Sequence, residues 1–186
     1  MRGHSSSALL LFLAAACASA GSGGTETAVA PVTTSLVNTG GTMNISGAET
    51  YTAISTAVPV SQDSAYQLIR RVYRELEMPV TIENGSNRSV GNEVLRVRRR
   101  LAGMLMQNIV DCGDKMGLKN AETWDIEMNI LSYATKNPEG GANVLTRIQA
   151  LGHDPSVSGR DQIPCATTGD LEAKIGNLVK AKVAGK

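Results

Sequence analysis

Apolar residues recur at helical spacing after Ser61, where the hydrophobic pattern of the chain is clearest. Between residues 62 and 76 the apolar positions fall on one face of a helix, and most arginines fall on the other. Ser61 supplies the side-chain oxygen of an N-cap, and Pro79 cannot continue a helix. The pattern therefore predicts a helix that begins after Ser61 and ends before Pro79. Its apolar face consists of Ala65, Leu68, Ile69, Val72 and Leu76.

A second helix is predicted near the C-terminal end of the sequence. Thr167 and Asp170 have the spacing of a helix-start signal, in which a hydroxyl and a carboxylate cap the first turn. Lysines late in this segment suit the negative end of the helix dipole. The apolar face is expected to consist of Leu171, Ile175, Leu178 and Val179.

Alternation of apolar and polar residues predicts the strands. It is strongest in residues 124–134 and 143–151, and the Asn, Pro and Gly residues between them, at 136–141, are typical of a turn. These two stretches are therefore expected to form a β-hairpin. A shorter alternating stretch at residues 54–60 predicts a strand just before the first helix.

Two further strands are predicted on either side of a turn at residues 84–87, where Asn and Gly tolerate positive φ. One is short, around residues 80–82, and the other is longer, over residues 90–101. Residues 102–120 fit two patterns. Either they form a helix, with one face made of Leu101, Leu105, Ile109 and Cys112, or a strand enters a Cys112-Gly113 turn.

The order of the elements is strand, helix, strands, hairpin and helix. This order predicts a single α+β domain over residues 50–183, with an antiparallel sheet and helices packed on one face. Residues 21–49 are rich in Gly, Thr and Ser and are expected to form a flexible linker, with a short strand around residues 33–37.

The first 20 residues have the layout of a secretory signal peptide. Arg2 gives a positive start, an apolar run covers residues 8–16, and Ala18-Ser19-Ala20 is a small-x-small cleavage site. The run is too short to cross a bilayer, which takes about 20 residues. Residues 1–20 are therefore expected to direct export, to the periplasm or outer membrane if the host is a Gram-negative bacterium.

Export would place the cysteines in an oxidising compartment. Cys112 and Cys165 are far apart in sequence and form no Cys-x-x-Cys motif, so a structural disulfide is expected rather than a redox pair. With His153 they supply too few ligands for a four-ligand zinc site of Cys and His. Cys17 follows Ala14-Ala15-Ala16 and is a candidate lipidation site, and the alternative is its removal with the signal peptide. No cofactor or metal is expected.

The charge balance limits the choice of partner. Lys and Arg number 18, Asp and Glu number 17, and only Arg2 falls in the signal peptide, so the mature chain is nearly neutral. This balance favours neither nucleic acid nor an anionic membrane, and membrane contact is expected only through a lipid anchor. On a strand, Arg96, Arg98 and Arg100 would share one face and form an anion-binding or partner-binding patch. The alternative is a solvated face paired with carboxylates such as Glu127.

No catalytic motif accompanies the acidic and histidine residues, so an enzyme is not expected. His153 and Asp154 are neighbours in a predicted turn and point apart, and Asp111, Asp114 and Glu127 have no spacing that would pair them. The sequence therefore predicts an exported, non-catalytic interaction module whose partner is an envelope protein or a cell-wall component. A hydrophobic-ligand carrier, with a cavity between sheet and helix, and a carboxylate-dependent hydrolase are the alternatives.

Two segments resemble those of exported bacterial domains of uncharacterised role. In one, the Cys112-Gly113 turn accompanies a Cys just before the terminal helix, in Cys165-Ala166-Thr167-Thr168-Gly169-Asp170-Leu171-Glu172; the other is Ser61-Gln62-Asp63-Ser64-Ala65-Tyr66, after a strand. The order of elements over residues 50–183 is similar to that of the helix-grip domains of the outer-membrane assembly lipoprotein BamC. This resemblance implies a helix-grip-like fold and an envelope-located, non-catalytic module, and it carries over no functional residue.

Overall fold

The structure, a computed structural model, describes residues 35–38, 41–44, 54–157 and 162–185. The expected signal peptide, Cys17 and most of the expected linker lie outside these residues. Within the linker stretch, β1 (Ser35–Asn38) and β2 (Gly41–Asn44) form a small antiparallel pair. β1 overlaps the short strand that was expected around residues 33–37.

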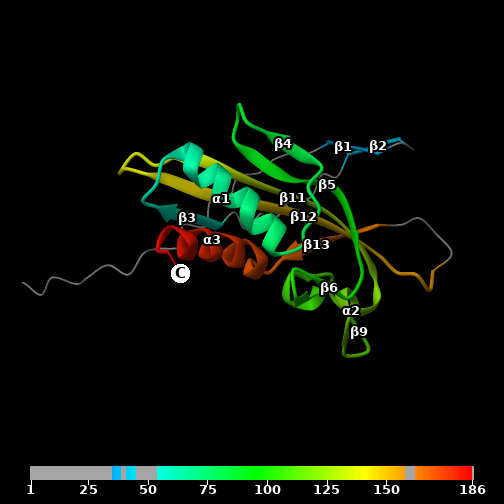
Figure 1. The fold of residues 1–186 in the computed structure, drawn as a ribbon. Helices are drawn as coiled ribbons and strands as arrows, with labels where there is room; N and C mark the ends of the chain where they lie inside the picture. Colours follow the sequence, from blue (N-terminus) through cyan, green and yellow to red (C-terminus); the bar gives the residue numbers. More distant parts are fainter. Residues whose placement is uncertain (1–34, 39–40, 45–53, 158–161, 186) are drawn as a thin grey trace, which may run out of the picture.

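The residues described from 54 onward form the expected α+β fold (Figure 1). The main sheet has the strand order β4-β5-β11-β12-β13-β8, and β3 also pairs with β12. All of these strand pairs are antiparallel. The strands are β3 (Ile54–Val58), β4 (Ile82–Asn84), β5 (Ser89–Val97), β8 (Val110–Asp111), β11 (Asp125–Lys136), β12 (Ala142–His153) and β13 (Ile163–Thr167).

The predicted hairpin of β11 and β12 forms the centre of the sheet. Its register runs from Asp125 opposite His153 to Lys136 opposite Ala142. Alternate side chains along both strands are buried, as expected for a sheet with one covered face. Along its other edge β12 has two neighbours, because its first half pairs with β3 and its last residues pair with β13.

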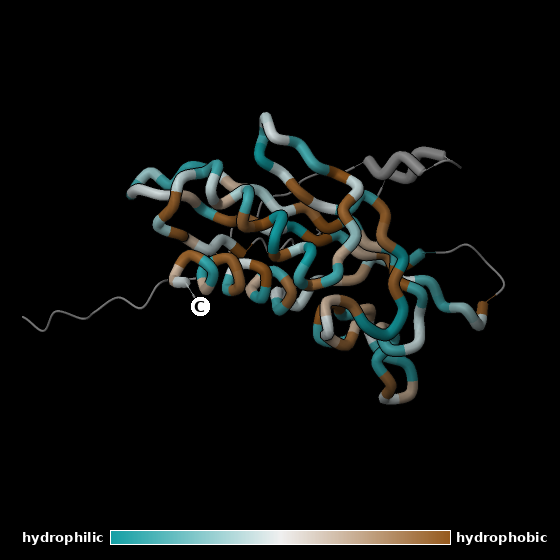
Figure 2. Tube along the Cα trace, viewed as in Figure 1, coloured by the Kyte–Doolittle hydropathy of each residue, from teal (hydrophilic) through white to brown (hydrophobic). Residues whose placement is uncertain are grey.

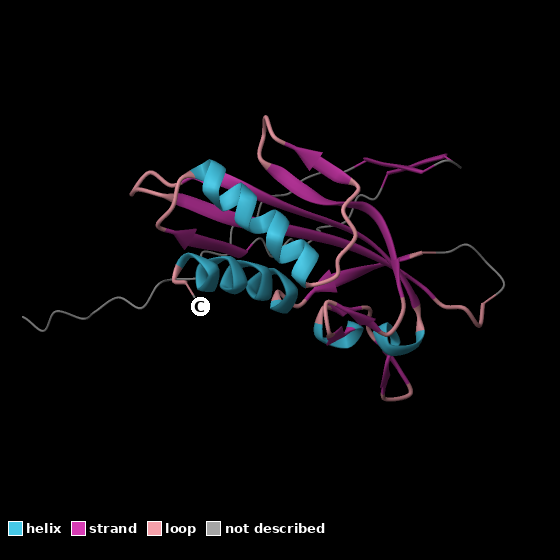
Figure 3. Cartoon of the chain, viewed as in Figure 1, coloured by secondary structure: helices cyan, strands magenta, loops and turns pink. Residues whose placement is uncertain are grey.

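Two helices, α1 (Gln62–Glu75) and α3 (Asp170–Val183), lie side by side over one face of the sheet (Figures 1 and 3). α1 begins as expected, because the Ser61 side chain accepts a hydrogen bond from the backbone N–H of Ser64. α1 ends before Pro79, where Glu77 takes a φ of 53° and Met78 turns into the core. Of its expected apolar face, Ala65, Ile69 and Val72 are buried, and Leu68 and Leu76 are half-buried against the core.

α3 is present where it was expected, but its predicted cap is not. The N-cap is Gly169, with a φ of 88° and no side-chain hydrogen bond. Instead, the Thr168 hydroxyl accepts from the backbone N–H of Asp170 at 3.3 Å and donates to the carbonyl of Asn108 at 2.7 Å. Thr168 therefore ties the start of α3 to the segment before β8. On its apolar face Leu171, Ile175 and Val179 are buried, and Leu178 is half-buried.

Side chains from the sheet and both helices form the core. Hydrophobic and hydrophilic residues alternate along α1 and α3, as expected for helices with one face on the sheet (Figure 2). The core also holds a chain of hydroxyls. The Tyr73 hydroxyl lies 2.9 Å from that of Ser132, which lies 2.7 Å from that of Thr146. Because all three are buried, these bonds offset the cost of removing the hydroxyls from water.

β5 is shorter than the sequence pattern predicted. It ends at Val97, and the chain then bends at Arg98 and Arg99, where Arg99 has a φ of 68°. A residue in this left-handed region does not continue a strand. β6 (Arg100–Leu101) pairs instead with β7 (Met104–Leu105) in a separate two-stranded sheet. The prediction of one strand over residues 90–101 is therefore wrong.

Residues 102–120 follow the second of the two predicted patterns. A 3₁₀ turn, η1 (Met106–Asn108), precedes β8, and β8 enters the Cys112-Gly113 turn. β9 (Asp114–Lys115) and β10 (Leu118–Lys119) then form a small hairpin, and the short helix α2 (Asn120–Thr123) leads into β11. The β9–β10 hairpin projects from the end of the molecule (Figure 1).

Candidate interaction surface

The predicted disulfide joins Cys112 and Cys165, whose Cα atoms are 4.3 Å apart. Cys112 lies between β8 and β9, and Cys165 lies in β13, opposite Ala150 of β12. The bond therefore fixes the base of the β9–β10 hairpin to the main sheet. Its Cα separation lies just below the usual range of about 4.4–6.8 Å.

Trp124 packs beside this disulfide, directly after α2. A Cβ atom on Gly152 would lie 2.7 Å from a ring carbon of Trp124 and 3.0 Å from the sulfur of Cys165. Only a residue without a side chain leaves room for both groups at this point of β12. Trp124 is the single tryptophan of the chain and is buried. The largest aromatic side chain of the protein therefore packs at the disulfide-bonded end of the sheet.

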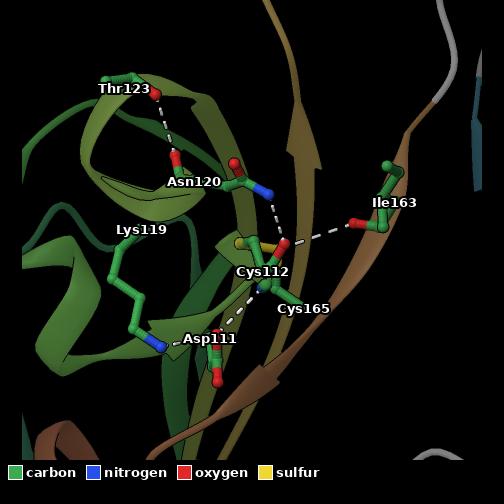
Figure 4. Close-up of a disulfide and its surroundings, with 8 residues drawn as sticks. Asp111, Cys112, Lys119, Asn120, Thr123, Ile163 and Cys165 are labelled. Carbon is green, nitrogen blue, oxygen red and sulfur yellow. Dashed lines mark hydrogen bonds and ion pairs between the residues drawn. A yellow bond between two sulfur atoms is a disulfide. The ribbon is translucent and has the colours of Figure 1, made fainter. Parts of the chain in front are cut away.

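Hydrogen bonds and ion pairs also hold the base of the β9–β10 hairpin (Figure 4). The Asn120 side-chain amide donates to the carbonyl of Cys112, and the Asn120 backbone N–H donates to the carbonyl of Gly113, both at 3.0 Å. The backbone N–H of Gly113 donates to the Asp111 carboxylate at 3.0 Å. Lys119 lies 3.8 Å from that same carboxylate. The base of the hairpin is therefore fixed by covalent and polar contacts together.

The tip of the hairpin carries exposed apolar side chains. Met116 is 96 % exposed and Leu118 is 63 % exposed, the two highest values among the large hydrophobic residues that the structure describes. Lys115 and Lys119 flank them, and both are exposed. Sequence reasoning missed this feature because Gly117 is the only turn signal between the two short strands, and two-residue strands have no measurable periodicity.

The three arginines expected to share one face do not lie on one strand. Arg96 lies on β5 and pairs with Glu127 of β11 at 3.2 Å, as the alternative of a solvated, ion-paired face predicted. Arg98 lies in the bend after β5 and pairs with Asp125 at 3.4 Å. Arg100 begins β6 in the separate small sheet. The single strand that was expected to carry all three is therefore wrong, and the role of these residues as an anion-binding or partner-binding patch stays a prediction.

The acidic residues named for a hydrolase lie in different surroundings. Glu127 contacts Arg96, and Asp111 contacts Lys119 and the backbone of Gly113. Asp114 is exposed at the start of β9, opposite Lys119 in the register of the hairpin. Each of these acids thus has a structural neighbour of opposite charge at the surface.

Glu172 is the acidic residue with the most unusual environment. It lies in the first turn of α3, where it is 1 % exposed, and neither carboxylate oxygen has a hydrogen-bond partner among the described residues. Burial raises the pKa of this carboxyl to about 7. The helical pattern gave no sign of this, because Glu is common in the first turn of an exposed helix.

His153 and Asp154 lie at the end of β12, next to the β9–β10 hairpin. His153 is the last residue of β12, opposite Asp125, and is half-buried rather than placed in a loop. Asp154 accepts hydrogen bonds from the backbone and the hydroxyl of Ser156, which hold the pKa of its carboxyl below the ordinary value. Asp154 also lies 3.8 Å from Lys115, which links the end of β12 to the β9–β10 hairpin.

An open depression of roughly 710 Å³ lies where α1 begins, beside the turn between β11 and β12. Asp63 and Arg88 form an ion pair at 2.6 Å within its lining, and Lys136 and Glu139 border it. Its lining combines these charged side chains with Pro59 and Val60. It is an open surface depression with charged borders, whereas a hydrophobic-ligand carrier would need an enclosed apolar cavity between sheet and helices.

None of the helices in the described part of the chain is long and apolar enough to span a membrane. In residues 35–38, 41–44, 54–157 and 162–185, no three His, Cys, Asp or Glu side chains are grouped as a metal site would require. No family model matches the chain, and neither a curated protein nor a solved structure matches it.

Proposed function

We propose that this protein is an exported, non-catalytic interaction module that binds an envelope protein or a cell-wall component. The Cys112–Cys165 disulfide carries the proposal. Disulfides persist in oxidising compartments and are rare in the cytosol, where thiols are kept reduced. The bond therefore supports the export that the first 20 residues predict, to the periplasm or to the outer membrane of a Gram-negative host.

The position of the disulfide supports binding rather than catalysis. Cys112 and Cys165 are buried beside Trp124, where they fix one end of the sheet. The bond thereby holds the exposed β9–β10 hairpin against the body of the domain, which is a structural task. The acids that a hydrolase would use are occupied by nearby cations, as for Glu127 with Arg96 and Asp111 with Lys119.

The proposal is tested with the full chain, carrying a C-terminal epitope tag, in its own host. We expect the protein in the envelope fraction, oxidised on a non-reducing gel, and starting at Gly21 or at a lipid-modified Cys17. In native electrophoresis of a gently solubilised envelope it should migrate in an assembly heavier than the 19.5 kDa chain. A variant that lacks residues 2–20 is the matched control and should stay reduced in the cytoplasm.

Two results would contradict the proposal. An intact Met1 on a reduced, cytoplasmic protein would refute export. A monomer in every native fraction of the envelope would refute the binding role.

A further inference from the structure

The turn at the tip of the β9–β10 hairpin places a bulky residue in an unfavourable backbone conformation. Lys115 pairs with Leu118, so Met116 and Gly117 form a two-residue turn. Their φ values are 56° and 80°. A turn with two positive φ values strongly prefers Asn, Asp or Gly. In the left-handed region the Cβ atom of an ordinary residue crowds the following carbonyl oxygen, and Met116 has no polar group to offset that strain.

Solvent exposure adds a second cost at the same residue. Met116 is 96 % exposed, so its side chain contacts almost nothing in the rest of the protein. Leu118 follows two residues later and is 63 % exposed. An Asn at position 116 would relieve both the backbone strain and the exposed apolar surface. Residues in a locally unfavourable conformation are found mainly at functional sites.

The hairpin is held in place before any partner binds. The disulfide fixes Cys112 to β13, and Asn120 closes the other side of the base through its bonds to Cys112 and Gly113. Lys115 and Lys119 each lie 3.8 Å from a carboxylate of the body, those of Asp154 and Asp111. A protruding segment that is already ordered loses little conformational entropy on binding, so more of the contact energy becomes affinity.

We propose that Met116 and Leu118 are the anchor residues of this module and enter an apolar pocket on a folded partner protein. The inference rests on the proposed function and names its contact site. A methionine side chain is long, unbranched and polarizable, so it adapts to a pocket of irregular shape. A few anchor residues in well-packed pockets carry most of the binding energy of many protein interfaces.

The charges around the tip favour a protein pocket over a lipid bilayer. Lys115 and Lys119 are accompanied by Asp111, Asp114 and Asp154, so this end of the molecule has no excess of positive charge. Attachment of a surface segment to an anionic bilayer depends on buried apolar area and on unpaired basic residues. Two apolar side chains among balanced charges supply little apolar area and no unpaired basic residue. They are enough, however, to fill one pocket on a protein.

The test begins by finding what the tip touches. A photoreactive p-benzoylphenylalanine in place of Leu118, in the full chain within its own host, should crosslink to one envelope protein after irradiation. The same residue in place of Glu139, in the turn between β11 and β12, is the matched control and should not give that product. The crosslinked protein is then produced and purified, and its affinity for the wild-type mature protein is measured.

Met116→Asn is the deciding variant, because a structural role and a binding role predict opposite effects. Asn is favoured at this turn position, so the thermal midpoint should stay the same or rise. The affinity for the purified partner should fall by about tenfold or more, as expected for loss of an anchor. Val94→Asn removes an apolar side chain that is 56 % exposed on β5 and should change the affinity by less than about twofold.

Each other result overturns the inference. Unchanged affinity in Met116→Asn would show that the tip is not the contact. Wild-type protein that sediments with vesicles of phosphatidylcholine and phosphatidylglycerol, and loses this in the variant, would assign the tip to a bilayer. A wild-type dimer that becomes monomeric in the variant would assign it to a second copy of this chain.

The native assembly separates this inference from the proposed function. If the assembly in the envelope persists unchanged in Met116→Asn, the tip is excluded and the binding role stands. If the wild-type chain forms no assembly, the binding role fails and the anchor residues fail with it.

Discussion

Glu172 shows how one residue couples this fold to pH. Among the described residues, it is the one Asp, Glu, Lys or Arg that is buried. Burial raises its pKa from the ordinary value of 4.5 to about 7. Repulsion from Asp170, two residues earlier in the same turn, makes a smaller contribution to this rise. The neutral form is therefore favoured in the folded state more than in the unfolded chain.

The sign of the resulting pH dependence follows from proton binding. Between about pH 4.5 and 7 the folded protein binds more protons at Glu172 than the unfolded chain does, so stability falls as the pH rises through this window. Below it both states are protonated, and above it both are charged. The full effect of such a shift is on the order of 3 kcal/mol.

Glu172→Gln should remove this dependence. The amide has nearly the same shape and carries no charge, so the variant should be more stable than the wild type at pH 8 and similar to it at pH 4. Urea unfolding at several pH values, followed by Trp124 fluorescence, measures the difference. Glu122→Gln, exposed on α2, is the matched control, and an equal pH profile for wild type and Glu172→Gln would contradict the assignment.

At the scale of elements, α3 lies unusually close to β3. Gly176 is the point of contact, because a Cβ atom there would lie 2.1 Å from the hydroxyl oxygen of Thr56. In the middle of a helix, Ala is normally more stable than Gly by about 1 kcal/mol. The close approach of helix and strand should reverse that preference.

Gly176→Ala should therefore destabilise the protein by about 1–3 kcal/mol, the usual cost of overpacking a core. Asn177→Ala, one residue later on the exposed side of α3, should be neutral or slightly stabilising. Adding Thr56→Ala to Gly176→Ala should cost less than the two single changes together, because it removes the closest contact. Additive effects in this double-mutant cycle, measured by urea unfolding, would show that the contact is not the cause.

Most regular elements could be predicted from the sequence because the residues that determine them lie within the element or directly beside it. Ser61 and the apolar spacing define α1, and the alternation on both sides of the Asn-Pro-Glu-Gly-Gly turn defines β11 and β12. β5 ends early for a reason that is not local. Val97 pairs with Ile126, next to the first residue of β11, so β5 has almost no partner strand left beyond it, and Arg99 then takes a left-handed φ that Arg seldom adopts.

The candidate surface was harder to predict than the fold. β8 owes its existence to β13, more than 50 residues later in the chain, and not to any pattern within residues 102–120. The disulfide could be inferred from the cysteine count, but the hairpin that it supports could not. A two-residue strand has no period to detect, and the exposure of Met116 depends on contacts that only the folded chain defines.

At the scale of the whole molecule, the disulfide joins segments that are 53 residues apart. Closing a loop of this length lowers the entropy of the unfolded chain by an amount worth about 4 kcal/mol at 25 °C. Such a contribution is a large part of the total of about 5–15 kcal/mol that is typical of single domains.

Replacing both Cys112 and Cys165 by Ala should therefore lower the free energy of unfolding by about 4 kcal/mol. Guanidinium unfolding of the oxidised wild type and of the double variant measures this. Reduced wild-type protein is the matched control and should unfold with the double variant. A loss of less than about 1 kcal/mol would mean that the bond does not stabilise the fold.

One edge of β12 is completed from both ends of the domain. Its first half, Ala142–Thr146, pairs with β3, the first strand of the main sheet in the chain, and its last residues, Ala150–Gly152, pair with β13, the last. A polypeptide that crosses a membrane N-terminus first would deliver β3 long before its partner. Until β12 and α3 arrive, Ile54–Val58 would be an uncharged, β-prone segment with nothing to pair with. On the proposed export route, native folding would thus wait for the last third of the chain. Until then, the newly exported N-terminal part would have to be kept from aggregating.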